Sequence, residues 1–176
     1  MRKLLNEELD RLEVEEYKES KKIPVMVVLD NIRSQNNIGS VFRTADAFRL
    51  EGIILCGITA TPPHREIHKT ALGATESVSW EYRTETTDAI IELKEKDYQI
   101  LSVEQVEGAV SLDQLTLLPG EKYAIVFGHE VRGVEQDVVN LSDRCIEIPQ
   151  YGTKHSLNIS VAAGIVIWEV FKKFSF

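Results

Sequence analysis

The sequence lacks long apolar runs. None approaches the roughly 18 to 20 residues that a membrane-spanning helix needs. The first ten residues carry five charges instead of the apolar stretch of a secretory signal. We therefore expect a protein of the cytoplasm that does not associate with a membrane.

Metal-ligating patterns are also scarce. Cys56 and Cys145 each lie inside an apolar run and lack the close spacing of a metal or redox motif, which indicates two buried, reduced thiols. His64 and His68 are four residues apart and could share one face of a helix as metal ligands. With no third ligand nearby, we favour a solvated or phosphate-contacting face and expect no metal site.

The common nucleotide and hydrolase loops are missing as well. Four residues separate Gly128 from Gly133, as in a phosphate-binding loop, but Val134 and Glu135 follow where that loop needs Lys and Ser or Thr. There is no Gly-x-Gly-x-x-Gly turn and no Gly-x-Ser-x-Gly elbow. These absences argue against a P-loop NTPase, a Rossmann-type dinucleotide-binding enzyme and a hydrolase with a Ser-His-Asp triad.

Positive charge is in deficit, with 20 basic against 28 acidic residues and a formal net charge of −8. That balance normally argues against a nucleic-acid partner, because phosphate neutralisation supplies most non-specific affinity. The deficit is uneven, however. Residues 30–73 carry five basic and four acidic groups, and residues 148–176 carry three and one. If these two segments meet in space, they can form a local basic face.

What the sequence does contain is enough material for one well-filled core. It has 176 residues, of which 43% are hydrophobic and 27% charged, as in ordinary globular proteins. We expect one domain over residues 23–176, preceded by a charged helical extension over residues 1–22. Leucines at near-helical spacing give that extension an apolar face for the core or for a partner.

The rest of the chain alternates between strand-like and helical patterns. Strands are expected at 25–29, 52–58, 77–82, 98–103, 123–127 and 144–148, and helices at 38–49, 66–72, 87–96, 135–140 and 157–173. Such alternation predicts an α/β fold with a mostly parallel sheet and helices on both faces. Ligands of such sheets bind beyond the carboxyl ends of the strands, where the loops 31–39, 128–133 and 149–158 carry unusual residues.

The first of these loops leads into a helix that contains Arg43 among apolar residues. Asn37 is a candidate N-cap, and the helix start could bind an anion. Taken alone, Arg43 is better explained as a structural partner of Asp46 or Glu130.

The other two loops each allow two interpretations. Gly128 permits a ligand to approach the backbone closely. Glu130 either orients Arg43 or Asn37 or is a solvated turn carboxylate. Ser156 and Asn158 flank the start of the last helix, where they either cap it or belong to a site.

Together, the segments NNIGSVFRTA (36–45), IVFGHEVRGV (125–134) and IEIPQYGTKHSLNISVAAG (146–164) resemble the SpoU (TrmH-like) branch of the SPOUT methyltransferases. The order and spacing match, and the likeness covers about residues 24–173. The resemblance implies an α/β sheet with a deep C-terminal trefoil knot, a rare exception to unthreaded chains. It also implies a homodimer with its active site near the subunit interface.

The activity implied by the resemblance is transfer of a methyl group from S-adenosyl-L-methionine (AdoMet) to a ribose 2′-hydroxyl of tRNA or rRNA, leaving S-adenosyl-L-homocysteine. On the matching positions, Gly128, Ile148 and Leu157 would line the AdoMet pocket. The implied catalytic residues are Asn37, Arg43, Glu130, Ser156 and Asn158. Because Arg is almost always protonated, we expect Arg43 to act through an RNA phosphate or by stabilising the forming alkoxide.

The chain departs from the family pattern in the third loop. Gln150 stands where Met is common, and Tyr151 and His155 are individual to this sequence, which bears on substrate choice more than on the reaction. We expect RNA contacts from the catalytic domain, its dimer partner or the N-terminal helix. The alternative function is a non-catalytic RNA-binding or assembly module with the same fold, which the charge of −8 favours. Methylation of a protein or small molecule would leave the ribose-specific resemblance unexplained.

Overall fold

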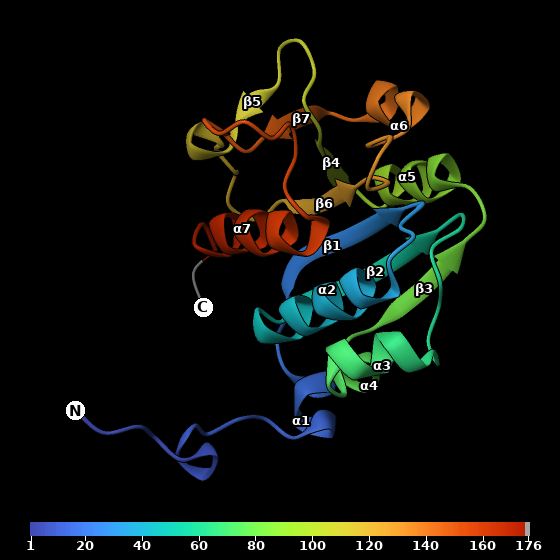
Figure 1. Ribbon diagram of the computed structural model, residues 1–176. Helices are drawn as coiled ribbons and strands as arrows, with labels where there is room; N and C mark the ends of the chain where they lie inside the picture. Colours follow the sequence, from blue (N-terminus) through green and yellow to red (C-terminus); the bar gives the residue numbers. More distant parts are fainter. Residues whose placement is uncertain (175–176) are drawn as a thin grey trace.

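The computed structural model describes residues 1–174, apart from the side chain of Asn6, and consists of a parallel sheet between two helical layers (Figure 1). The strands are β1 Ile23–Asp30, β2 Leu50–Cys56, β3 Trp80–Arg83, β4 Tyr98–Val103, β5 Val110–Ser111, β6 Lys122–Phe127 and β7 Arg144–Glu147. Over these residues they form one seven-stranded sheet in the order β3-β2-β1-β6-β4-β7-β5. All neighbouring pairs are parallel.

Helices cover both faces of the sheet. One layer contains α2 Gln35–Ala47, α3 Arg65–Ala71, α4 Ala74–Ser77 and α7 Ile159–Phe171, and the other contains α5 Thr86–Glu95 and α6 Gln136–Leu141 (Figure 1). In β1, Val25, Val27 and Leu29 pack into the core under the first layer, whereas Val28 belongs to the core under the second. A strand buried on both sides needs a continuous apolar run, which explains the sequence of β1.

The predicted α/β class is confirmed, and every strand and helix expected after residue 22 forms with its ends shifted by at most three residues. The structure adds α4, β5 and the 3₁₀ turn η2 Leu112–Gln114, all too short for a periodic signal. The C-terminal trefoil knot stays a prediction. Residues 175–176 of the predicted domain lie outside the described residues.

The continuous helix predicted over residues 1–22 is wrong. This segment contains a 3₁₀ turn, η1 Asn6–Glu8, and a single short helix, α1 Val14–Glu19. Tyr17 is buried, whereas Leu4 and Leu5 are exposed, and Figure 1 shows the first residues running away from the body of the molecule. A helix of this length is marginal without a surface to pack on, so the apolar spacing alone was insufficient.

The two cysteines are free, as predicted, but only Cys56 is fully buried while Cys145 is half-buried. Burial raises the pKa of the Cys56 thiol to about 12 and raises that of Cys145 above its usual value. Both therefore stay protonated at neutral pH. Within residues 1–174 no helix is both long and apolar enough to cross a bilayer.

The two segments with a positive balance do meet. Segment 30–73 contributes α2, and segment 148–176 contributes α7, which packs beside it (Figure 1). The rings of Phe48, just after α2, and Trp168 in α7 lie 5.6 Å apart. The geometric condition for a local basic face is therefore met on this side of the sheet.

Candidate functional site

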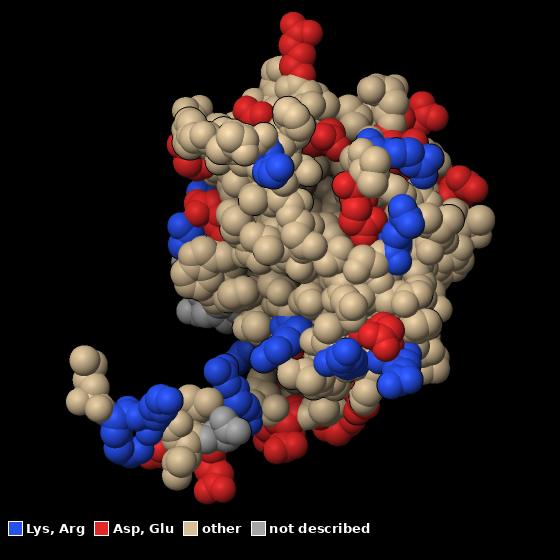
Figure 2. Space-filling view, in the orientation of Figure 1, with Lys and Arg blue, Asp and Glu red and all other residues tan. Residues whose placement is uncertain are grey.

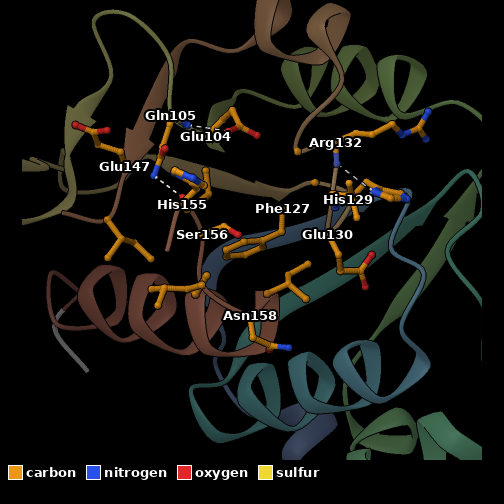
Figure 3. Close-up of a pocket in the computed structure, with 18 of the residues that line it drawn as sticks. Glu104, Gln105, Phe127, His129, Glu130, Arg132, Glu147, His155, Ser156 and Asn158 are labelled. Carbon is orange, nitrogen blue, oxygen red and sulfur yellow. Dashed lines mark hydrogen bonds between the residues drawn. The ribbon is translucent and has the colours of Figure 1, made fainter. Parts of the chain in front are cut away.

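A pocket of about 480 Å³ opens at the carboxyl ends of β4, β6 and β7, and we call it the strand-end pocket. Its walls come from three segments, Val103–Gln105, Phe127–Gly133 and the chain from Ile146 to Asn158, and from the start of α7. Figure 3 shows Glu104, Gln105, Glu147 and His155 on one side of it, Phe127 and Ser156 near its centre, and Glu130 and Asn158 toward α2. The predicted convergence of loops at this edge is thus confirmed for 128–133 and 149–158.

The turn after β6 is closed by its own hydrogen bonds. The backbone N–H of His129 donates to Gly133 O at 2.9 Å, and the N–H of Gly133 donates back to His129 O at 2.8 Å. The Nδ1 atom of His129 accepts the N–H groups of Val131 and Arg132 at 3.0 and 3.3 Å. Through these two bonds the His129 side chain holds the turn in its closed shape.

Gly128 lines the strand-end pocket, but the structure gives a different reason for the glycine than ligand approach. A Cβ at this position would collide with the backbone of Gly133 and Val134. The missing side chain therefore makes room for the turn itself to fold back on β6. Any effect of Gly128 on a ligand would act through the shape of this turn.

Three side chains from the three predicted loops form one hydrogen-bonded chain. Asn158 Nδ2 donates to Asn37 Oδ1 at 3.2 Å, and Asn37 Nδ2 donates to Glu130 Oε1 at 3.3 Å. Asn37 is buried, so its amide has few alternative partners and is fixed in this orientation. The structure thus brings Asn37, Glu130 and Asn158 together, as the sequence predicted.

Glu130 is the anchor of this chain. Its carboxylate also accepts the backbone N–H groups of Arg33 and Ser34 at 3.0 and 2.9 Å, at the start of α2. Burial raises the pKa of the Glu130 carboxyl, but these amides and the Asn37 side chain outweigh it and hold the pKa below its usual range. Glu130 is therefore an ionised acceptor at neutral pH, and of its two predicted partners it orients Asn37, not Arg43.

The prediction that Asn37 caps its helix is wrong. Ser34 is the N-cap of α2, and its Oγ accepts the N–H of Asn37 at 3.3 Å. The helix starts earlier than its apolar pattern, so Asn37 lies in the first turn and its side chain is free for the site. At the start of α7, Asn158 both caps the helix and takes part in the site. Its Oδ1 accepts the N–H of Ser160 at 2.9 Å, and its Nδ2 donates to Asn37.

Arg43 lies elsewhere. It is exposed about two turns along α2 from Asn37, and it lines a separate depression together with Ser40, Phe48 and Lys69, which we call the Arg43 hollow. Among the described residues its guanidinium makes no hydrogen bond or ion pair, so the structural pairing with Asp46 or Glu130 is wrong. Within one chain, the structure does not bring Arg43 to the strand-end pocket.

The remaining predicted residues do line that pocket. Ile148, Ser156 and Leu157 all contribute to its wall. Ser156 and Leu157 are exposed, so their side chains are open to a ligand. Capping explains Asn158 but not Ser156, since Asn158 is the cap of α7.

Two acidic residues were missed by the sequence analysis. Glu104 follows β4 and accepts the backbone N–H groups of Gln105 and Val134 at 2.9 and 2.8 Å, which ties β4 to the turn after β6. Asp30 ends β1, is fully buried, and accepts Thr86 Oγ1 at 2.6 Å and the N–H of Glu135 at 3.0 Å. The available signal was a carboxylate placed where an apolar strand ends.

The lining decides which ligands the pocket suits. It combines the apolar Phe127, Ile148 and Leu157 with three carboxylates, Glu104, Glu130 and Glu147, against one cation, Arg132. Such a pocket favours a ligand that is partly apolar and carries positive charge. The described residues contain no cluster of three or more His, Cys, Asp or Glu side chains that could hold a metal ion.

Fold and pocket together define an α/β protein with a nucleoside-sized site beyond the carboxyl ends of parallel strands. The chain belongs to the SpoU rRNA Methylase family, whose model matches residues 24–168. It is 31% identical over 160 residues to a protein of Staphylococcus haemolyticus assigned to the TrmH family of tRNA/rRNA methyltransferases. That match covers 91% of this chain but only 63% of the relative.

Solved structures agree on the fold. An AdoMet-bound rRNA methyltransferase from Sinorhizobium meliloti superimposes with a TM-score of 0.81 at 26% identity, covering 89% of this chain and 59% of that one. The TrmH/SpoU tRNA-modifying enzyme of A. aeolicus gives a TM-score of 0.80 at 24% identity, covering 91% of this chain and 80% of that one. The second likeness concerns the fold alone.

Proposed function

We propose that this protein is an AdoMet-dependent RNA methyltransferase that transfers a methyl group to a ribose 2′-hydroxyl of tRNA or rRNA in the cytoplasm. The carrying observation is the chain of Asn158, Asn37 and Glu130, which joins the strand-end pocket to the start of α2. Membership of the SpoU family supports the class of reaction. The ribose as acceptor rests on the resemblance of these residues to the family's catalytic set.

The strand-end pocket fits AdoMet by size and charge. Its volume of about 480 Å³ lies within the usual range for small-molecule sites. AdoMet carries a sulfonium and an ammonium group, and three carboxylates against one cation favour such a ligand. Gly128, Ile148 and Leu157 would hold it, and once bound it would supply the electrophilic methyl group.

The protein's own residues would align the acceptor. Methyl transfer to a hydroxyl is an in-line displacement, which needs orientation and removal of a proton. Glu130 fixes the Asn37 amide, and Asn37 in turn fixes Asn158 beside Ser156, so that the amides and the hydroxyl form a preorganised edge for a ribose. Arg43 would stabilise the forming alkoxide, directly or through an RNA phosphate.

Arg43 can do this only if a second copy of the chain completes the site. Val161, Ile165 and Trp168 lie at helical spacing on α7 and are 50%, 39% and 49% exposed, which makes an apolar stripe on the surface. Phe48 contacts Trp168 and also lines the Arg43 hollow, so the stripe and the hollow form one continuous surface. We propose a homodimer through this stripe, which carries Arg43 of one protomer to the strand-end pocket of its partner.

The direct test uses labelled AdoMet and total RNA from a cell that lacks this protein. We expect a labelled nucleotide, located by mass spectrometry, with the methyl group on the ribose. A methyl group on a base would contradict the choice of acceptor. Absence of AdoMet binding by calorimetry would instead favour the alternative, a non-catalytic RNA-binding module with the same fold.

A further inference from the structure

A second concave site lies on the far side of α3 from the Arg43 hollow. Its volume is about 520 Å³, and its walls come from the loop before α3, from α3 and α4, and from the first residue of β3. We call it the Trp80 pocket. The lining side chains that matter here are Pro62, His64, Arg65, His68, Glu76 and Trp80.

Trp80 is placed as a stacking surface. It begins β3, which is an edge strand of the sheet, and 37% of it is exposed. Trp80 is outside both hydrophobic core clusters that the described residues form. The indole is therefore partly open at the edge of the sheet, where a nucleobase could stack on it whatever the base.

The polar groups around the indole suit a phosphate. The Arg65 side chain is 94% exposed, and its Nε lies 3.9 Å from Glu66, too far and too open for a strong ion pair. His64 Nδ1 accepts the N–H of Glu66 at 3.2 Å, which leaves Nε2 as a donor. His68 is exposed on the same helix. Among the described lining residues Glu76 is the one carboxylate, so donors outnumber it.

The Trp80 pocket and the Arg43 hollow are both lined by α3. Lys69 and Thr70 of α3 line the Arg43 hollow, and Arg65 and His68 of the same helix line the Trp80 pocket. Figure 2 shows several Lys and Arg side chains near α2 and α3 with a carboxylate among them, on a protein whose net charge is −8. Glu66 lies 3.9 Å from both Arg65 and Lys69, so it offsets only part of their charge. A polyanion that passes Arg43 therefore finds further cations across α3 before it reaches the indole.

We propose that the Trp80 pocket binds an unpaired nucleotide of the RNA substrate other than the one that is methylated. Its base stacks on Trp80, and its phosphate contacts Arg65 and His68. The pocket would thus help to select RNA in which a single-stranded nucleotide lies near the target. This inference rests on the proposed function only in taking RNA as the ligand.

Fluorescence can test the stacking without any methyl transfer, because the chain contains two tryptophans. Trp168→Phe leaves Trp80 as the sole indole, and Trp80→Phe leaves Trp168. At low salt, a single-stranded oligoribonucleotide of about ten nucleotides should quench the Trp168→Phe protein strongly and the Trp80→Phe protein weakly. No quenching of Trp80, or equal quenching of both proteins, would overturn the proposal. An equal response of Trp80 to polyglutamate would mean that the pocket takes acidic chains in general and would overturn it too.

Affinity measurements give the second test. Trp80→Ala, and Trp80→Leu as a variant that keeps an apolar side chain without an aromatic ring, should each weaken RNA binding about 5- to 100-fold, the usual effect of losing one stacked base. Arg65→Ala should weaken it less, and Lys96→Ala at the C-cap of α5, which removes the same charge elsewhere, should have little effect. Unchanged RNA affinity in all Trp80 variants would refute the pocket's role.

These outcomes separate the two proposals. Ribose methylation together with unchanged RNA affinity in the Trp80 variants would refute nucleotide binding by the Trp80 pocket and leave the proposed function intact. Conversely, quenching of Trp80 by RNA in a protein that binds no AdoMet would keep the pocket and sink the proposed function. AdoMet affinity, measured by calorimetry, should be the same in the wild type and in every Trp80 variant.

Discussion

The two ends of α2 differ in how completely one chain surrounds them. At its start, Asn37 is buried and bonded to Glu130 and Asn158, and the strand-end pocket lies beside it. About two turns further on, Arg43 is exposed and, within residues 1–174, bonded to no other side chain. The difference teaches that a single chain contains the pocket and the amides beside it but keeps Arg43 apart from them. Under the proposed function, a partner surface would have to bring the two together.

The strongest way to break this comparison is Arg43→Ala. We expect methyl transfer to fall about 100- to 1,000-fold, as when one transition-state donor is removed. Because Arg43 lies outside the strand-end pocket and outside the core, AdoMet affinity and the free energy of unfolding should stay unchanged. Single-turnover assays and calorimetry measure the two effects, and an equal loss of transfer and AdoMet affinity would mean that Arg43 is structural.

A charge on the apolar stripe should have the next largest effect. Ile165→Asp places a carboxylate where the proposed interface is apolar, so the protein should sediment as a monomer and lose transfer while it still binds AdoMet. Ile91→Asp is the matched control, since Ile91 is also exposed but lies on α5. Sedimentation of the wild type as a monomer would remove the proposed route by which Arg43 reaches a pocket.

Gly128→Ala tests the other end of the comparison. Its Cβ would collide with the backbone of Gly133 and Val134, so the turn must shift. We expect a loss of about 1–3 kcal/mol in the free energy of unfolding and weaker AdoMet binding by calorimetry. Gly152→Ala is the control, because a Cβ there meets no atom within 4 Å. Normal AdoMet affinity in Gly128→Ala would place the cofactor elsewhere.

Of the four substitutions, Glu130→Gln should have the smallest effect, which we expect to see in protein stability. We expect it to lower the free energy of unfolding by about 1 kcal/mol at pH 7, because charge-assisted hydrogen bonds are lost. The folded-state pKa of Glu130 lies below its unfolded value of about 4.3. Its stabilisation is therefore fully present above that pH and disappears as the pH falls through the folded-state value.

Urea unfolding at several pH values measures this difference. The gap between wild type and Glu130→Gln should close as the solution is acidified below pH ~4. Glu107→Gln, which removes a charge from an exposed site outside the network, should show no such gap. A gap that persists in acid would mean that the charge of Glu130 is not what stabilises the start of α2.

The sequence predicted the sheet and its two helical layers, because apolar runs are local signals. The grouping of Asn37, Glu130 and Asn158 was implied by the resemblance to the family. The sequence did not predict Ser34 as the cap of α2, since the helix begins before its apolar pattern does. Glu104 and Asp30 went unnoticed because their partners are backbone groups distant in the chain. The prediction of a helix over residues 1–22 was wrong because its leucines have helical spacing but no surface to pack against.

The central claim, that two chains share each active site, is tested most directly by mixing two variants that are each impaired for a different reason. Arg43→Ala keeps an intact pocket, and Gly128→Ala keeps an intact Arg43. If Arg43 serves the partner's pocket, unfolding and refolding the two together yields mixed dimers with one complete site, and transfer should recover to about a quarter of the wild-type rate. If Arg43 acts only in its own chain, Arg43→Ala and Gly128→Ala should stay as inactive together as they are apart.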